Sequence, residues 1–361
     1  MNAIFRVPTC LQTGGMRRRR VVGYHMSGGV DLSAGAGAAT TISVVLPCYN
    51  ASAWVGKAIQ SVLDQDYPGI EIIVVDDGSS DDSLEIVRTF GNKIRWLSGP
   101  NRGACAARNR GLGVCAGDFV LFLDADDYLY GKYLLQMAKF ATPGTAVVVG
   151  AHAWIDTEHN RLLEFQAYQG ANSHRALLAR YLTHPMQSAA LLWERKSLLE
   201  AGGWNEGLPI SQDAELALRM FLRGGKFEVA VLNNAYAVWC EHTAPRITNR
   251  ITQAKVEAML RVLSAHAPGL IALQDPEINK GLAVRFYSLS RLAYANGHDA
   301  VGMTAQKAAA ELGLTVPMGT PLHRLTTRVF GLRLKTRIAA QYHRALARAT
   351  VHQRPYPYNL S

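Results

Sequence analysis

The sequence predicts an α/β fold in which helices flank a mostly parallel sheet, followed by an α-helical C-terminal extension. The chain has 361 residues, enough for one large domain with an appendage. Apolar residues make up 48% of it and charged residues 18%, which supplies a core and excludes global disorder. From residue 41 onward, short β-branched segments alternate with amphipathic ones at spacings typical of βαβ units.

The first 40 residues differ from the rest of the chain. They are rich in Gly, Ser, Ala and Arg, show no hydrophobic periodicity and contain four consecutive arginines at 17–20. No apolar signal-peptide core follows these arginines. We therefore expect a disordered leader at residues 1–40, with Met16 or Met26 as alternative starts. The five cysteines form no C-x-x-C pair, which favours a reducing cytoplasm.

Strands and helices are expected in regular alternation between residues 42 and 123. A buried strand at 42–46 is ended by Pro47, and a helix with one apolar face follows at 51–65. The next expected elements are a strand at 70–75, a helix at 81–90, a strand at 93–97, a helix at 103–115 and a strand at 119–123. Polar clusters follow three of these strands, at 48–50, 76–77 and 124–127. Ligands bind beyond the carboxyl ends of such strands, so we expect the clusters to share one crevice.

The two common phosphate-binding loops are absent from this crevice. A dinucleotide-binding fold needs G-x-G-x-x-G/A directly after its first strand, where residues 47–50 read Pro-Cys-Tyr-Asn. The match at residues 111–116 ends a helix and precedes a strand, which is the wrong context. No G-x-x-x-x-G-K-[ST] motif occurs, which excludes a P-loop nucleotidase.

Asp124 and Asp126 form a D-x-D triplet directly after a buried strand. Side chains two residues apart in an extended segment project to the same side. Two such carboxylates repel each other, and a divalent cation is the usual relief. The alternative is that Asp126 and Asp127 cap the next helix. A cation held by one or two carboxylates keeps positions open for substrate phosphates, so a divalent cation is the expected cofactor.

Five ordered motifs resemble family 2 glycosyltransferases of the GT-A type, which transfer sugars from nucleotide-sugars with inversion at the anomeric carbon. The matching segments are residues 43–50, 74–79, 101–109, 122–127 and 201–213. Their order and spacing agree, and the resemblance covers residues 42–242. It implies the GT-A nucleotide-diphospho-sugar transferase fold, with a catalytic domain at 41–245 and a helical basic region at 246–361.

The resemblance also implies a donor site at the strand ends. Tyr49 would stack on the base, and Asp76 would accept a hydrogen bond from uracil or its equivalent. Asp124 would reach the ribose or the metal, while Asp126 and His242 would be ligands of that metal, Mg²⁺ or Mn²⁺. The remaining implied donor-site residues are Pro47, Asn50, Asp77, Arg102, Arg108 and Ala125. The alternatives are a surface helix pair for the two arginines and an ordinary polar loop residue for His242.

Asp213 opens a helix with an apolar side, and the resemblance implies that it is the general base that deprotonates the acceptor hydroxyl. Many relatives have Glu before this aspartate, where this chain has Gln212. Trp204 and Gln212 would lie on the acceptor side. Two alternatives stay open: Glu215 as the base, or Asp213 as a carboxylate that only stabilises its helix N-terminus.

Beyond residue 245 the pattern becomes helical and basic. Amphipathic segments are expected at 251–265, 279–295 and 300–312, and residues 325–348 alternate basic and apolar side chains. No carboxylate follows Glu311, and the whole chain carries a formal charge of +10. This asymmetry favours a polyanionic partner. We expect an interfacial helix on anionic lipids, with a helix packed on the catalytic domain as the alternative.

The resemblance and the basic C-terminal pattern together imply a cytoplasmic, membrane-peripheral glycosyltransferase. It is expected to move a sugar from a UDP-sugar to a glycan or lipid-linked acceptor, in cell-surface polysaccharide biosynthesis. One alternative is a non-catalytic basic module that binds nucleic acid or anionic polymer. The other is a nucleotidyltransferase of similar fold. The paired acids argue against the first, and the lack of a basic Gly-rich loop after the first strand argues against the second. Nucleic acid is therefore not expected as a partner.

Overall fold

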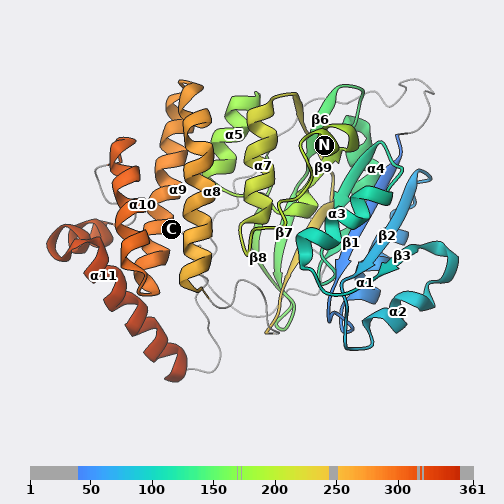
Figure 1. The fold of residues 1–361 in the computed structure, drawn as a ribbon, viewed down its shortest axis with the longest axis horizontal. Coiled ribbons are helices and arrows are strands. Elements are labelled where there is room, and N and C mark those ends of the chain that lie inside the picture. The colour runs from blue at the N-terminus through green and yellow to red at the C-terminus, as the bar shows by residue number, and fades with distance from the viewer. Residues whose placement is uncertain are drawn as a thin grey trace, which may run out of the picture.

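The computed structural model describes residues 40–168, 170–171, 173–243, 251–314, 318 and 321–349. The expected leader lies outside the described residues except for Thr40. Two sheets form the first part of the chain, and four helices follow them (Figure 1). Among the helices of the described ranges, none is both long enough and apolar enough to span a bilayer.

The central sheet has seven strands in the order β10–β6–β9–β4–β1–β2–β3. Its strands are β1 (Ile42–Cys48), β2 (Ile70–Asp76), β3 (Arg95–Ser98), β4 (Phe119–Phe122), β6 (Thr145–Val149), β9 (Leu191–Glu194) and β10 (Lys226–Val229). Strands β4, β1, β2 and β3 are parallel, and β9 is antiparallel to both of its neighbours. The predicted mostly parallel sheet is confirmed. Its parallel strands bring their carboxyl ends to one edge.

Alternate residues of the central strands face two separate cores. Val45 and Phe122 belong to one core and Leu46 and Leu121 to the other, because successive side chains of a strand point to opposite faces. The helices on these faces are α1 (Val55–Leu63), α2 (Ser83–Thr89), α3 (Ala104–Val114), α4 (Tyr133–Met137) and α6 (Arg195–Glu200). Helix α3 packs so closely on β1 that a Cβ atom added at Gly111 would strike the Val45 side chain.

A second sheet has the order β5–β11–β7–β8. Its strands are β5 (Tyr128–Tyr130), β7 (His152–Asp156), β8 (Arg161–Gln166) and β11 (Tyr236–Glu241). The sequence predicts only the last of these, near residues 235–240. Strand β8 exposes apolar side chains such as Leu162 and Phe165, so it lacks the alternation that marks a half-buried strand.

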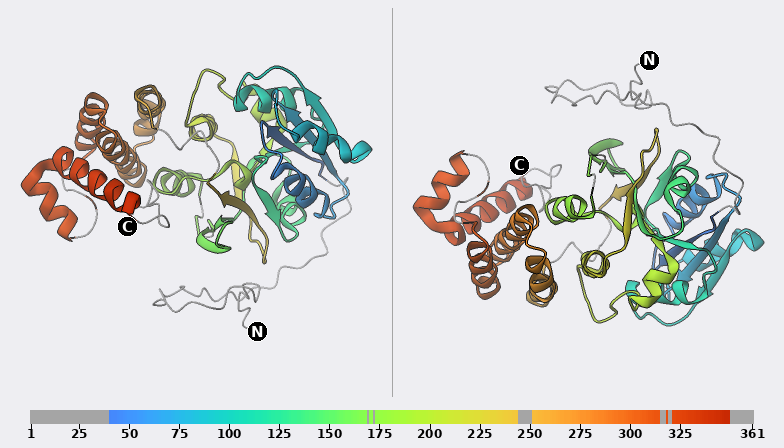
Figure 2. Two further views of the ribbon diagram at one scale, coloured as in Figure 1. Left: turned by 90° about the horizontal axis from the view of Figure 1, so that it is seen from below. Right: turned by 90° about the horizontal axis from the view of Figure 1, so that it is seen from above.

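Helices connect the sheets to the C-terminal region. Helices α5 (His174–Thr183) and α7 (Gln212–Arg223) lie between the sheets and α8 (Gln253–Ala272), α9 (Pro276–Ala295) and α10 (Asp299–Glu311) (Figures 1 and 2). Helix α8 continues through Pro268, beyond the end expected at residue 265. The helix expected at 325–348 is present, with a kink that the sequence pattern did not indicate. Helix α11 (Pro321–Ala349) is kinked at Gly331, whose φ of 72° is a left-handed conformation that glycine adopts without strain.

Candidate active site

The carboxyl ends of the parallel strands open into a cleft of about 1880 Å³. Most of the predicted site residues line it. They are Pro47, Tyr49, Asn50, Asp77, Arg108, Asp124, Ala125, Asp126, Gln212, Asp213 and His242. Asp76, Arg102 and Trp204 are not among the lining residues. The structure therefore brings the end of β1, the end of β4, the start of α7 and the loop after β11 together around one space.

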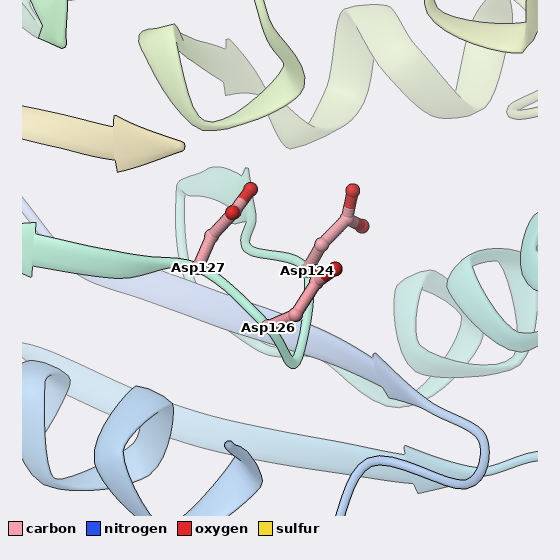
Figure 3. A group of neighbouring side chains, drawn as sticks. All are labelled: Asp124, Asp126 and Asp127. Atoms are coloured by element: carbon pink, nitrogen blue, oxygen red, sulfur yellow. The ribbon is translucent and has the colours of Figure 1, made fainter. Parts of the chain in front are cut away.

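Three acidic side chains follow β4 and extend toward the same side of the chain (Figure 3). Asp124, Asp126 and Asp127 each offer a carboxylate oxygen, and these oxygens lie within 4.8 Å of one another. Asp127 is an addition to the predicted set, and its Oδ1 accepts a hydrogen bond from the Cys240 N–H at 2.9 Å. The capping alternative is wrong, since α4 begins only at Tyr133 and has no side-chain cap. Carboxylate oxygens at this spacing suit Mg²⁺ or Mn²⁺.

His242 joins the acidic cluster from the end of the second sheet. Its Nε2 lies 3.0 Å from Asp126 Oδ2, and its ring stacks on Trp54 with centroids 4.4 Å apart. The side chain is 8% exposed, which does not fit an ordinary polar loop residue. The stacking fixes the ring so that one nitrogen faces the cluster. A ligand role for His242 stays a prediction that this geometry fits.

Arg108 lies between the acidic cluster and α7. Its Nη2 donates to Asp124 Oδ1 at 2.6 Å, its Nη1 donates to Gln212 Oε1 at 3.3 Å, and its Cζ lies 4.5 Å from the Trp204 ring centroid. Burial lowers the pKa of Arg108, but the carboxylates of Asp124 and Asp213 outweigh this effect and raise it, so the guanidinium stays charged. The surface alternative is wrong for this residue, which is 5% exposed.

Arg102 has a different environment. Its side chain is 63% exposed and pairs with Glu206 at 3.3 Å, outside the cleft. Trp204 is buried, with its ring edge-on to Phe122 and its face toward Arg108. The tryptophan therefore supports the arginine and does not itself line the acceptor space.

Asp213 is the second residue of α7 and is half-buried in the cleft wall, with its Oδ1 closed off from solvent. Within the described part of the chain, its Oδ1 has no hydrogen-bond partner. Burial raises the pKa of Asp213 to about 6, the charge of Asp124 adds to this, and Arg108 opposes it. The sequence suggested that the helix N-terminus would favour the charged form, but desolvation is the larger effect. The helix begins after Ser211, which adopts a left-handed φ of 61°.

Glu215, the alternative base, points elsewhere. Both of its oxygens accept hydrogen bonds from Arg219, at 2.9 Å from Nε and 2.7 Å from Nη2. It does not line the cleft. The structure therefore gives Glu215 no access to an acceptor hydroxyl and leaves Asp213 as the candidate base.

The end of β1 provides an open aromatic surface. Tyr49 is 52% exposed within the cleft, as a ring that stacks on a base must be. Asn50 has a left-handed φ of 48°, and its Oδ1 accepts a hydrogen bond from the Ser80 N–H at 2.8 Å. This contact joins the loop after β1 to the loop after β2.

Asp76 and Asp77, at and just after the end of β2, hold the loops around the predicted donor site. Asp76 is buried and accepts hydrogen bonds from the Ser79 N–H and the Ser98 hydroxyl, at 3.1 and 2.7 Å. Asp77 accepts from the backbone N–H groups before α3, including that of Gly103 at 2.7 Å. The structure thus shows positioning contacts for both, and the predicted base contact of Asp76 stays a prediction.

The sequence did not indicate that two tryptophans would line the cleft. Trp154 and Trp239 are partners in register on β7 and β11, with ring centroids 4.7 Å apart. The Trp154 Nε1 donates to Glu241 Oε2 at 3.3 Å. A strand pattern around residue 154 would have been the signal, but that strand was not recognised.

Comparison with known proteins shows what the part of the chain that forms this cleft is similar to. Residues 43–202 match the model of the family described as Glycosyl transferase family 2. A Campylobacter jejuni protein named GalNAc(5)-diNAcBac-PP-undecaprenol beta-1,3-glucosyltransferase is 32% identical over 170 residues, 46% of this chain and 55% of that protein. Streptococcus pneumoniae glycosyltransferase GlyA is 28% identical over 273 residues, 71% of this chain and 38% of that protein. The chain spans about half or less of the length of such curated relatives.

Solved structures agree on the architecture. The S. aureus TarS fragment 1–349, solved with UDP-GlcNAc, superimposes with a TM-score of 0.62 at 20% identity, over 85% of this chain and 92% of that one. The same fragment with UDP gives a TM-score of 0.60. At this identity the likeness establishes the fold, which confirms the predicted GT-A architecture with C-terminal helices.

Proposed function

We propose that this chain, which carries a family 2 glycosyltransferase domain at residues 43–202, transfers a sugar from a nucleotide-sugar donor to a hydroxyl group of an acceptor. The observation that carries the proposal is the convergence, in one cleft, of the acidic cluster after β4 with the half-buried carboxylate of Asp213. Direct displacement at a sugar carbon is aided by a group that neutralises the departing phosphate and by a separate base, and the acidic cluster could hold a cation for the first role.

At the donor end, Tyr49 stacks on the base of the nucleotide, while Asp77 holds the loop before α3. Asp124, Asp126 and His242 are the residues that would hold Mg²⁺ or Mn²⁺. When bound, such a cation neutralises charge on the departing nucleoside diphosphate. We propose a UDP-sugar as the donor, because the structural neighbour TarS was solved with UDP and UDP-GlcNAc.

At the acceptor end, Asp213 takes the proton of the hydroxyl that attacks the anomeric carbon. With a pKa of about 6 the carboxylate is mostly ionised at pH 7.5, and it is a stronger base than an exposed aspartate. Arg108 bonds to Asp124 and to Gln212, the residue before the base, so it fixes the start of α7 against the donor end. A single displacement by this route inverts the anomeric carbon.

A donor screen tests the proposal. Purified protein is incubated with UDP-, GDP- and dTDP-sugars, with Mn²⁺ or with EDTA, and nucleotide release is measured. We expect slow hydrolysis of one donor class that EDTA abolishes, with calorimetric binding of the matching nucleoside diphosphate. Absence of both hydrolysis and nucleotide binding for all three classes would overturn the function.

We further propose a cytoplasmic location with peripheral contact to an anionic membrane through α11. One side of α11 packs on α9 through buried residues such as Leu332, and Arg333 and Arg337 pair with Asp299 of α10. The opposite side carries large apolar side chains that are 50 to 66% exposed. They are Leu325, Val329, Phe330, Leu334, Ile338 and Tyr342. Exposed Arg324 and Arg328 flank them, a combination that suits anionic lipid.

Vesicle binding tests the membrane contact. The double variant Val329→Asp and Ile338→Asp places charge on the exposed apolar side, and we expect it to lose co-sedimentation with phosphatidylglycerol vesicles. The matched control is Met303→Asp on α10, where the wild-type side chain is 54% exposed. Equal co-sedimentation of the double variant and the control would refute the contact. Membrane attachment would fit an acceptor used in cell-surface polysaccharide synthesis.

A further inference from the structure

The cleft is larger than a nucleotide-sugar requires. Its volume of about 1880 Å³ exceeds the roughly 300–1,000 Å³ of ordinary small-molecule pockets. Its walls continue from the acidic cluster past Asp213 to α5 and α9, which lie beyond α7 from the sheets (Figure 1). The space beyond the base is where an acceptor must enter if the proposed function holds.

One face of α9 forms the far wall of this space. Gly281, Val284, Ser288, Leu292 and Ala295 line the cleft at spacings of three and four residues, which puts them on one side of the helix. The lined face extends over roughly 20 Å. This length accommodates several units of a chain-like acceptor.

Charge is divided between the two ends of the cleft. The end at the carboxyl edge of the sheet is lined by five aspartates and by the cation Arg108. The aspartates are Asp77, Asp124, Asp126, Asp127 and Asp213. Among the charged side chains that line the end at α5 and α9, basic ones predominate, namely Arg180, Lys280, Arg285 and Arg291. Its lining carboxylates are Glu164 and Glu277, and Glu277 pairs with Lys280 at 3.3 Å.

At the basic end of the cleft, the positively charged side chain of Arg291 lies near that of another basic residue. Arg291 is half-buried, and no carboxylate in the described part of the chain pairs with it. Burial and then the charge of Arg291 lower the pKa of Lys335 on α11. The adjacent Thr336 is 8% exposed and lines the cleft, and its hydroxyl has no partner among the described residues. Like charges and an unused hydroxyl at one place favour an anionic ligand.

We propose that the α9 end of the cleft binds a phosphate group of the acceptor, through Arg285 and Arg291. The inference rests on the proposed glycosyl transfer and adds the chemical class of its acceptor. Arginine suits this role because its planar guanidinium donates two parallel hydrogen bonds to phosphate oxygens. The phosphate can come from two sources, the diphosphate of a lipid-linked glycan or the repeated phosphates of a polymer. Helix α11, with its exposed apolar side, packs against α9 and so borders the same end of the cleft.

The test compares Arg285→Gln and Arg291→Gln with Arg261→Gln, which removes an exposed arginine of α8 outside the cleft. Transfer is measured to a sugar on farnesyl diphosphate, to a poly(glycerol phosphate) oligomer and to a neutral oligosaccharide. We expect KM for one or both phosphate-bearing acceptors to rise about tenfold in each cleft variant, because a charge-assisted contact is lost. KM for the neutral acceptor should change less than twofold, and the Arg261 variant should match wild type.

The experiment distinguishes failure of the proposed phosphate site from failure of the proposed glycosyl transfer. Binding of the oligomer and of the farnesyl diphosphate sugar is also measured by calorimetry in EDTA, which needs no turnover. If wild type hydrolyses donor but the cleft variants bind and use all acceptors as wild type does, the phosphate site is wrong and the function stands. A rise in KM of equal size for the neutral acceptor also overturns the inference, since it indicates a general structural effect. If no donor is hydrolysed, the function fails, and tenfold weaker oligomer binding in the cleft variants alone still supports an anion site.

Discussion

Replacing Asp213 by Asn should inactivate the protein and stabilise it at the same time. The amide keeps the shape of the side chain but accepts no proton at neutral pH. Transfer should therefore fall by about 10² to 10⁴, the usual contribution of a general base. The affinity for UDP, measured by calorimetry on the same sample, should stay within a factor of two because Asp213 lies on the acceptor side. In the wild type, turnover should decline as the pH falls below about 6, where the base becomes protonated.

The gain in stability follows from the pKa of Asp213. Burial raises this pKa from 3.8 to about 6, so the folded state holds the proton more tightly than the unfolded chain does. Stability is then lost as the pH rises from 3.8 through 6, and the full loss above that range is roughly 3 kcal/mol. Asn carries no charge and avoids this loss. The variant should therefore be more stable than wild type by up to roughly 3 kcal/mol at pH 8, and by about half as much at pH 5.

Urea unfolding at pH 5 and pH 8 measures both values. Asp66→Asn is the matched control: its wild-type carboxylate is 87% exposed, so its difference in stability from wild type should be small at both pH values. A variant that is less stable than wild type at both pH values would refute the desolvation argument. Turnover of Asp213→Asn near the wild-type rate would refute its role as the base, whatever the stability result.

Two further substitutions test the metal site and the core. Asp126→Ala should weaken Mn²⁺-dependent UDP binding and abolish transfer, and a calorimetric titration with unchanged affinity and metal dependence would remove Asp126 from the site. Gly111→Ala should destabilise the fold by about 1–3 kcal/mol, because its Cβ strikes Val45 of β1. Gly113→Ala on the same helix has open space around the added methyl group and should be neutral or stabilising by up to about 1 kcal/mol. Equal urea midpoints for the two alanine variants would contradict the packing argument.

The strand ends were predictable because they depend on local pattern and on general rules of chain topology. Buried β-branched segments that alternate with helices form parallel strands, and their polar ends then meet at one edge. Long-range contacts were not predictable in this way. Whether Arg108 points outward or inward depends on Asp124 and Trp204, which are distant in sequence. The raised pKa of Asp213 likewise depends on burial that no local pattern reveals.

Helices α8 and α9 share a buried core with the central sheet, whereas α11 is largely exposed. Two truncations should reveal this difference. Val256 of α8 and Leu282 of α9 belong to the same buried core as Val147 of the central sheet. Ending the chain at residue 245 would expose that core and remove the α9 wall of the cleft, so we expect an insoluble product. Ending it at residue 320 removes α11 and the twelve residues after it, and most of the large apolar side chains of α11 face solvent. That shorter chain should stay soluble and bind UDP as the full chain does. A soluble, UDP-binding product that ends at residue 245 would show that the predicted boundary near that residue separates independent domains, and that the shared core is not required for folding.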